Sequence, residues 1–288
     1  MVDLQIESLK RTLRGHLSEF ASDKSAWRYH PVYGVLKTIH EYGESAFLCG
    51  GAVRDILLYG RQSAPRDLDI ILAYLPENHV ESLLKTYEGR RTKFGGISIK
   101  VLDWNLDIWS LMETWAFKER LVRGFCFADF PKTTFLDIDA VAIELFTKKG
   151  CARKIYSKGF FEAMLNKTID INFEENPYPA VCIAKSLAYA LKFRFKLSRR
   201  LAEYIIRYSE QIGAEEIANI FQKRYGNIKI SSEKYNFYIN AIKEELRVKN
   251  TGPIKLPLQD YRIDKGFSSL NRYFNKDRET SLLFKCNS

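Results

Sequence analysis

The chain has 288 residues, of which 46% are hydrophobic, and it carries a formal net charge of +10. This length suits one large domain or two modest ones, and the apolar content excludes a disordered chain. No apolar run approaches the roughly 20 residues of a membrane-spanning helix, and residues 1–20 are charged and amphipathic, unlike a signal peptide. We therefore expect a cytoplasmic protein with no membrane association. The basic charge favours an acidic partner such as nucleic acid, although solubility alone could explain it.

Helices and strands alternate in the predicted first half. Apolar residues recur at helical spacing from Ile6 to Phe20, and a second helix is predicted between Pro31 and Gly43. Further on, the pattern predicts helices at 53–58 and 79–87 and strands at 46–48, 68–72, 97–101, 106–109 and 138–146, the third and fourth strands being paired across a turn at 103–105. This order predicts an α+β fold with a small mixed sheet.

From about Gly150 onward the pattern predicts helices and no further strands. Ser198 and Ser231 fit helix N-caps, and the tail beyond Asn250 is expected to be irregular and to lie along the surface. The expected helices span 160–165, 179–194, 198–212, 214–225 and 231–247. We therefore expect a head domain over 1–150, with its N-terminal helices at 1–43, and an all-helical domain over 151–288.

Cysteine and histidine give no sign of a zinc site. The five cysteines are odd in number and form no Cys-x-x-Cys pair, which indicates reduced, mostly buried thiols. The four histidines show no metal-ligand spacing. Zinc chemistry and a histidine-based catalytic triad are therefore disfavoured.

Asp67 and Asp69 are two residues apart: Asp69 lies in the predicted strand 68–72, and Asp67 directly precedes it. Alternate side chains of a strand share one face, about 7 Å apart, so the two carboxylates could hold Mg²⁺ or Mn²⁺ and bridge phosphates. Asp107, an isolated charge in the apolar strand 106–109, is the candidate third ligand. We predict that these three residues bind metal and are catalytic, as in two-metal phosphoryl transfer. The alternatives are a solvated loop for the pair and a hairpin cap for Asp107.

A second pair, Asp137 and Asp139, has the same spacing. It lacks an upstream glycine pair, so it ranks below Asp67 and Asp69. Its part in the site is left open.

Gly50 and Gly51 precede the predicted helix 53–58. Without Cβ atoms their backbone N–H groups can approach a phosphate closely, and the helix N-terminus favours an anion. Arg54 and Arg66 are further candidates for binding the phosphates of a nucleotide. The alternatives are a plain turn and a structural ion pair between Arg54 and Asp55.

The stretch from Leu48 to Ile71 resembles the head domain of class II CCA-adding enzymes and bacterial poly(A) polymerases. That family carries Gly-Gly-x-Val-Arg-Asp-x-Leu-Leu-x-Gly-Arg followed by Asp-x-Asp, and residues 50–61 and 67–69 match this pattern. The similarity continues more loosely through 94–97 to Asp107, where the family has its third acidic residue. The resemblance implies a nucleotidyltransferase head of the polymerase-beta-like type, two-metal catalysis and a nucleoside triphosphate donor.

The similarity weakens where the family selects its nucleotide. Its Arg-Arg-Asp motif corresponds to Thr133-Thr134-Phe135, which has no arginine. In its neck helix, Cys182 and Ala188 stand where the family has arginines, and Lys185 alone keeps a positive charge. The resemblance therefore implies a nucleotide-binding role for Lys185 and implies the reaction type better than the substrate.

Basic residues alternate with phenylalanines at the end of this helix and just beyond it. Such a pattern can follow a phosphate backbone and offer stacking faces, so we expect RNA contacts here, whereas a core role for the phenylalanines is the alternative. The candidates are Lys192, Arg194, Lys196, Arg199 and Arg200. Trp104, Trp109 and Trp115 could line a pocket for a base, or they could be core residues.

Together these features predict an enzyme that transfers a nucleoside monophosphate from a nucleoside triphosphate to a hydroxyl group. The expected acceptor is an RNA 3′ end, tRNA among the candidates. A toxin-like or defence enzyme with another acceptor, and a non-catalytic RNA-binding protein, are the alternatives. A protein partner is compatible with the sequence but is not indicated by it.

Overall fold

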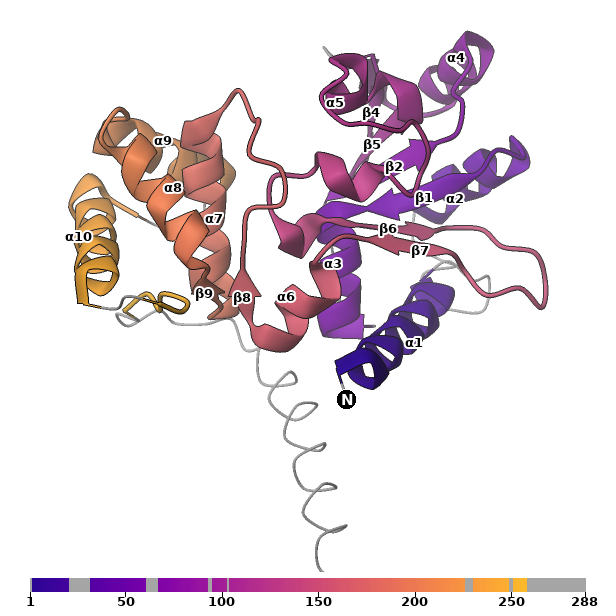
Figure 1. The fold of residues 1–288 in the computed structure, drawn as a ribbon. Helices are drawn as coiled ribbons and strands as arrows, with labels where there is room; N and C mark the ends of the chain where they lie inside the picture. The colour runs from indigo at the N-terminus through magenta and orange to yellow at the C-terminus, as the bar shows by residue number, and fades with distance from the viewer. Residues whose placement is uncertain are drawn as a thin grey trace, which may run out of the picture.

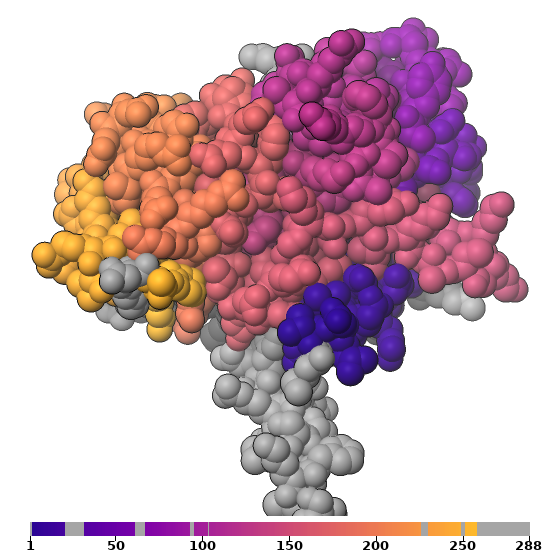
Figure 2. All heavy atoms as spheres, viewed as in Figure 1, coloured from indigo at the N-terminus to yellow at the C-terminus, as the bar shows by residue number. Residues whose placement is uncertain are grey.

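The computed structural model describes residues 2–20, 32–60, 67–92, 95–102, 104–225, 230–248 and 251–257. A seven-stranded sheet occupies one part of the molecule, and helices α7 to α10 gather at the other end (Figure 1). In the space-filling view the C-terminal helices lie at the left and most of the N-terminal half at the right, with residues from the middle of the chain between them (Figure 2). No helix of the described residues is long and apolar enough to cross a membrane.

The sheet has the strand order β3-β4-β5-β2-β1-β6-β7. Strands β2 and β5 are parallel, and the other neighbouring strands are antiparallel. The strands are β1 (Ala46–Cys49), β2 (Asp67–Leu72), β3 (Gly89–Arg91), β4 (Ile97–Val101), β5 (Trp104–Ser110), β6 (Val141–Glu144) and β7 (Ile155–Ser157).

The main hydrophobic core joins one face of the sheet to the helices. Helix α2 (Val32–Glu41) shows how the sequence produces this packing: its buried residues Val32, Val35, Leu36 and Ile39 recur at helical spacing. The other helices of this half are α1 (Val2–Phe20), α3 (Gly50–Tyr59) and α4 (Glu77–Thr86). Alternate strand residues such as Leu48, Ile70 and Ile108 enter the same core.

The opposite face of the sheet carries a smaller core. It is formed by Phe47, Cys49 and Ile71 from the strands together with residues of the segment 111–130. This segment contains η3 (Leu111–Glu113) and α5 (Trp115–Lys118) and is followed by η4 (Phe130–Thr133) and η5 (Asp137–Asp139). This second face is only partly covered, and the candidate site lies on it.

Helices α7 (Pro179–Phe193), α8 (Arg199–Ser209), α9 (Ala214–Arg224) and α10 (Ser232–Val248) pack against one another in the C-terminal half. Helix α6 (Phe160–Asn166) packs instead against α1 and η5. The parallel strands β8 (Thr168–Ile169) and β9 (Lys196–Leu197) follow α6 and α7. The Ser198 side chain accepts a hydrogen bond from the Leu201 N–H, and Ser231 accepts one from Lys234, so both predicted N-caps are present.

The α+β class and the predicted helices are confirmed, with ends that differ by a few residues. The predicted strand 138–146 is wrong at its start, because 137–139 form a 3₁₀ turn and the strand begins at Val141. The predicted absence of strands beyond residue 150 is also wrong, since β7 extends the sheet at its edge and β8 pairs with β9. The division into domains 1–150 and 151–288 stays a prediction.

Three smaller expectations also change. Trp104 and Asn105, predicted to lie in a turn, belong to β5. Of the four described cysteines, Cys49 and Cys182 are buried, whereas Cys126 and Cys151 are exposed. The tail is irregular over 251–257, but Ile254 and Leu256 are buried, so this part packs into the helical half. The remainder of the tail lies outside the described residues.

Candidate active site

Strand pairing brings the predicted carboxylates together. Asp69 lies opposite Asp107 in the parallel pair β2–β5 and opposite Cys49 in the antiparallel pair β1–β2. Because paired residues point to the same face of a sheet, Asp69 and Asp107 are neighbours on the partly covered face. Asp67 lies on the same face, two residues before Asp69 on β2, and its Oδ1 accepts a hydrogen bond of 2.9 Å from Asn105 Nδ2.

The protonation of Asp69 reflects this crowding. Burial and the neighbouring charge of Asp107 raise the pKa of Asp69 to about 7, with a smaller opposing effect from Lys185. Lys185 thus offsets only part of the effect of burial and the neighbouring carboxylates on Asp69. A bound cation would supply the remaining positive charge.

Strand register brings the three carboxylates close together, but they do not by themselves form a complete metal-binding site. Within the part of the chain that the structure describes, no group of three or more His, Cys, Asp or Glu side chains is arranged to hold a metal ion. Asp67 and Asp69 line the cleft described below, and Asp107 is not among its lining residues. The assignment of all three as metal ligands therefore stays a prediction.

The glycine pair forms the turn from β1 into α3, directly beside the carboxylates. Gly50 has φ +65°, a conformation that side chains with a Cβ rarely adopt, and a Cβ placed there would lie 3.5 Å from Asp69 Oδ2. The N-terminus of the ten-residue helix α3 therefore opens next to Asp69. Such a helix end favours a phosphate. Arg66 lies outside the described residues.

Arg54 sits in a buried network of charges. Its Nη1 donates a hydrogen bond of 2.6 Å to Asp139 Oδ1, and its Nε donates one of 2.9 Å to Asp55 Oδ1. The guanidinium carbon also lies 4.3 Å from the centre of the Tyr189 ring and 4.6 Å from that of Phe193. The expected alternative, an ion pair of Arg54 with Asp55, is thus present.

Asp139 joins this network to the helical half. Lys185 Nζ, from α7, lies 2.6 Å from Asp139 Oδ2, so one carboxylate holds two cations from different elements. Burial alone would raise the pKa of Asp139, but Lys185 and Arg54 outweigh it and lower this pKa below its usual value. The same pairing raises the pKa of Lys185 against the effect of burial. All three side chains are therefore charged at neutral pH.

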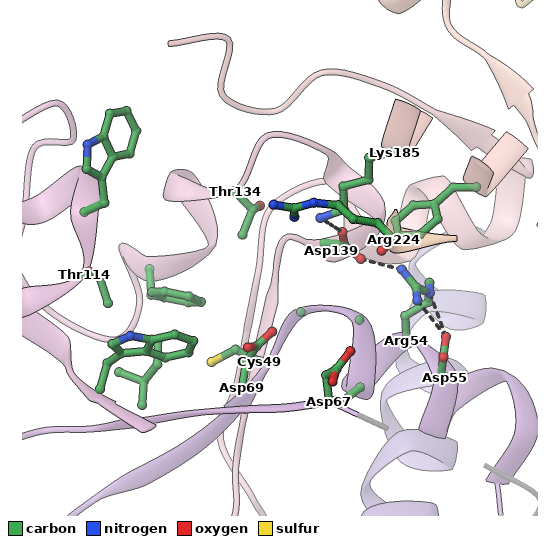
Figure 3. Close-up of a pocket in the computed structure, with 18 of the residues that line it drawn as sticks. Cys49, Arg54, Asp55, Asp67, Asp69, Thr114, Thr134, Asp139, Lys185 and Arg224 are labelled. Atoms are coloured by element: carbon green, nitrogen blue, oxygen red, sulfur yellow. Dashed lines mark hydrogen bonds and ion pairs between the residues drawn. The ribbon is translucent and has the colours of Figure 1, made fainter. Parts of the chain in front are cut away.

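A cleft of about 680 Å³ connects these groups. Figure 3 shows Thr114 on one side, Asp67 and Asp69 near the centre, and Asp139, Lys185 and Arg224 on the other side. The residues that line the cleft include the glycine pair, two carboxylates, aromatic residues and cations: Gly50, Gly51, Asp67, Asp69, Trp109, Trp115, Tyr189, Lys192, Arg224 and Tyr225. The size suits a nucleotide-sized ligand.

The predicted RNA-binding residues divide into two groups. Lys192 lines the cleft, and its Nζ lies 3.7 Å from Asp55 Oδ2. Arg199 pairs with Glu203 and Arg200 with Glu174, outside the cleft. Arg194 is the C-cap residue that follows α7, and Lys196 lies in β9. Phe193 and Phe195 are buried, in agreement with the alternative core role. RNA binding by the five basic residues stays a prediction.

Several cleft residues were missed in the sequence. Asp139 was identified only as part of a second acidic pair, and Tyr189, Arg224 and Tyr225 were not singled out. Tyr189 lies one helical turn after Lys185, so the helix period could have indicated it. Arg224 and Tyr225 end α9, far away in sequence, and carried no local signal. Of the three tryptophans proposed for a base pocket, Trp109 and Trp115 line the cleft, whereas Trp104 is in the main core.

No protein-family model and no curated protein sequence matches the chain. Solved structures do match it. A tRNA-processing enzyme with CTP is 20% identical, with a TM-score of 0.50 over 73% of this chain and 56% of that protein. A CCA-adding enzyme with CTP is 16% identical, with a TM-score of 0.52 over 73% and 52%. A tRNA nucleotidyltransferase with a primer tRNA and an incoming ATP analog is 18% identical, with a TM-score of 0.51 over 73% and 60%.

These matches establish the fold. The chain has the mixed sheet and following helices of CCA-adding enzymes, so the predicted resemblance to that family is confirmed at the level of the fold. The chain spans between 52% and 60% of the length of these three proteins.

Proposed function

We propose that the protein is a metal-dependent nucleotidyltransferase that moves a nucleoside monophosphate from a nucleoside triphosphate to the 3′ hydroxyl of an RNA. The observation that carries the proposal is one cleft in which a glycine turn, a helix N-terminus and adjacent carboxylates face a cationic wall. A binding protein has no need for adjacent carboxylates in a site that would otherwise attract phosphate. The fold likeness to enzymes bound to CTP, to an ATP analog and to tRNA supports the same activity.

The donor set fits Mg²⁺ or Mn²⁺. Mg²⁺ is commonly held by one or two protein carboxylates together with substrate phosphates, so Asp67 and Asp69 suffice on the protein side, with Asp107 as the candidate third ligand. The raised pKa of Asp69 indicates a carboxylate that a cation would stabilise in its charged form. When bound, such ions lower the pKa of the attacking hydroxyl and neutralise charge on the phosphates.

The protein's own groups would position the substrate. The N–H groups at Gly50 and Gly51 can approach the triphosphate closely, and Lys185 and Arg224 lie on the wall that would face its negative charge. No side-chain base is required, because phosphoryl transfer depends mainly on positioning and charge neutralisation. Arg54 is buried in its ion pairs, so we propose that it acts on the nucleotide chiefly by holding Asp139.

Nucleotide choice is proposed to differ from that of CCA-adding enzymes. Thr133 and Thr134 stand in place of two arginines of that family's sugar-binding motif, and Cys182 and Ala188 stand in place of two more on α7. These neutral side chains cannot make the hydrogen bonds of a guanidinium. A fixed addition of C and then A is therefore not part of the proposal.

The proposal is tested with purified protein, Mg²⁺ and each of the four α-labelled nucleoside triphosphates, mixed separately with total RNA or with a protein pool. We expect label on RNA, and no label with Asp67→Ala/Asp69→Ala. Glu244→Ala, which removes an exposed carboxylate on α10, is the matched control and should label RNA as the wild type does.

The other outcomes are equally informative. Label on protein instead of RNA would contradict the RNA acceptor and favour a toxin-like or defence enzyme. Absence of label from every mixture, in protein that is folded, would contradict the enzyme and leave a non-catalytic RNA-binding protein.

A further inference from the structure

Two tryptophans, Trp109 and Trp115, are among the residues that line the cleft, and Trp115 directly follows Thr114, which lies on the side away from Lys185 and Arg224 (Figure 3). We propose that Trp109 and Trp115 bind the terminal nucleoside of a single-stranded RNA acceptor by stacking on its base. The inference rests on the proposed function, which it extends by naming the subsite for the acceptor.

Strand register places Trp109 beside the reacting centre. Trp109 pairs with Ile71 in β2–β5, and Asp107 pairs with Asp69 two residues earlier. Residues two apart on a strand share a face and lie about 7 Å apart, so the Trp109 side chain follows the carboxylates on the same face. This distance is about the length of a nucleoside, whose base could lie on the indole while its ribose reaches the carboxylates.

The indole of Trp109 is held in place. A Cβ added to Gly96 would overlap this ring and would lie 2.6 Å from the carbonyl oxygen of Ile108, so the Gly96 backbone presses against the ring edge. Trp115 begins α5 and, like Trp109, packs against the smaller core while lining the cleft. Rings that are fixed before binding lose little entropy when a base stacks on them.

The charges of the cleft are divided between its two sides. The cations Lys185 and Arg224 lie on the side opposite Thr114 (Figure 3). Glu113, next to Thr114 in the sequence, also lines the cleft, and its carboxylate is paired with Lys118, which is not among the lining residues. A triphosphate therefore favours the first side, whereas the second side suits a nucleoside that bears no terminal phosphate.

Reaction geometry then assigns the two sides. In phosphoryl transfer the attacking and leaving oxygens lie roughly in line, on opposite sides of the phosphorus. If the leaving pyrophosphate lies toward the glycine turn and the cations, the attacking hydroxyl must approach from the tryptophan side. The acceptor hydroxyl would release its proton to solvent water and form the new bond to the α-phosphorus, while the bond from that phosphorus to the bridging oxygen breaks and pyrophosphate leaves. The nucleoside on the tryptophans is therefore the one that carries the 3′ hydroxyl.

The test is a fluorescence titration of a short single-stranded RNA whose 3′-terminal base is 2-aminopurine, in the absence of nucleoside triphosphate. Stacking quenches this base, so the wild type should bind and quench it. Loss of one stacking ring should weaken binding by about 5- to 100-fold in Trp115→Ala, whereas Trp115→Phe should keep most of the affinity. Phe125→Ala, an exposed aromatic residue of the same segment that does not line the cleft, is the matched control and should bind as the wild type does.

Binding of Mg²⁺-ATP and Mg²⁺-CTP by the same variants separates the alternatives. We expect unchanged nucleotide affinity in Trp115→Ala, which also shows that the variant is folded. Weakened nucleotide binding with unchanged RNA binding would assign the tryptophans to the incoming nucleotide and overturn the inference. Unchanged quenching in Trp115→Ala, or no RNA binding by the wild type, would also overturn it.

The titration does not depend on turnover. Quenching that requires Trp115 in a protein that transfers no label would support the subsite while the proposed function fails. Transfer to RNA by a protein whose RNA binding is insensitive to Trp115 would leave the proposed function in place and remove the subsite.

Discussion

Asp139 is the residue on which the charged wall of the cleft depends. Its carboxylate is 3% exposed and is shared between Arg54, also 3% exposed, and Lys185. Removing one member of a buried ion pair is costly, because the remaining charge loses its partner without gaining water. Arg54 and Lys185 come from α3 and α7, so Asp139 also fixes these two helices relative to each other.

We expect Asp139→Ala to lower the free energy of unfolding by about 3 kcal/mol, the lower end for a broken buried pair because Lys185 is partly exposed. Urea denaturation measures the change. Glu244→Ala, which removes an exposed pair with Arg247, should cost less than about 1 kcal/mol. Equal, small effects of the two substitutions would contradict the network.

Substitution of Asp69 should lower activity without lowering stability. Asp69→Asn removes a carboxylate that burial and Asp107 disfavour, so thermal unfolding in the presence of EDTA should occur at the same or a higher temperature. Nucleotidyl transfer should fall by about 100-fold or more, because charge stabilisation at the phosphates is lost. Asp3→Asn, on α1, should change neither. A stable Asp69→Asn variant with wild-type activity would remove Asp69 from the catalytic site.

At the scale of elements, the turn from β1 into α3 joins the sheet to the proposed phosphate site. Its geometry requires Gly50, whose φ of +65° brings the helix N-terminus beside Asp69. Gly43 has a similar φ of +73°, but no atom lies within 4 Å of a Cβ placed there. A comparison of substitutions at the two glycines can therefore distinguish the effect of backbone strain from an effect on the phosphate site.

Gly50→Ala and Gly43→Ala should each lower the free energy of unfolding by about 1–2 kcal/mol, because both place a Cβ in the left-handed region. Only Gly50→Ala should also weaken binding of Mg²⁺-ATP or Mg²⁺-CTP, which isothermal titration calorimetry measures. If both variants bound nucleotide as the wild type does, the glycine turn would not be the phosphate site.

The turn η5 should make stability depend on pH. Burial raises the pKa of Asp137 to about 7, and the charge of Asp170 adds to this against hydrogen bonds that the carboxylate accepts from backbone N–H groups. Between about pH 4 and pH 7 the folded protein therefore holds a proton that the unfolded chain has lost. The contribution of Asp137 to the free energy of unfolding falls as pH rises through this interval.

Asp137→Asn cannot ionise and keeps an oxygen to accept the hydrogen bond from Asp170 N. We expect the variant to gain about 2 kcal/mol relative to the wild type between pH 5 and pH 8, a value reduced for the partial exposure of the side chain. Urea denaturation at the two pH values measures the gain, and Asp3→Asn supplies the control. A stability difference that is independent of pH would show that Asp137 titrates normally.

Elements with a regular local pattern could be predicted from the sequence, and those formed by distant pairing could not. The buried positions of α2 recur at helical spacing, and Asp107 stood out as a single charge in an apolar strand. Strand β7 is three residues long and only partly buried, so it exists because β6 lies beside it. Asp139 of the turn η5 is bound by Arg54, 85 residues away, and such a distant contact leaves no local signal that distinguishes 137–139 from a strand.

At the scale of the whole molecule, the cleft is shared between the sheet and the C-terminal helices. The carboxylates and tryptophans come from the sheet and the segment after it, whereas Lys185, Tyr189 and Arg224 come from α7 and α9. The resemblance in sequence was close over residues 50–61 and 67–69, and it predicted the glycine turn and the acidic strand. Over the helices the resemblance was weak and indicated Lys185 alone. Tyr189, Arg224 and Tyr225 of the same wall emerged only from the folded arrangement.

The most direct test of the account is transfer of α-labelled nucleotide by the wild type to one short RNA prepared with a 3′ hydroxyl and with a 3′ phosphate. Nucleotidyl transfer needs the free hydroxyl, and Asp67 and Asp69 are proposed to hold the metal that activates it. We predict Mg²⁺-dependent labelling of the hydroxyl form alone, and none by Asp67→Ala/Asp69→Ala. Equal labelling of both RNA forms, or undiminished labelling by the double variant, would contradict the account.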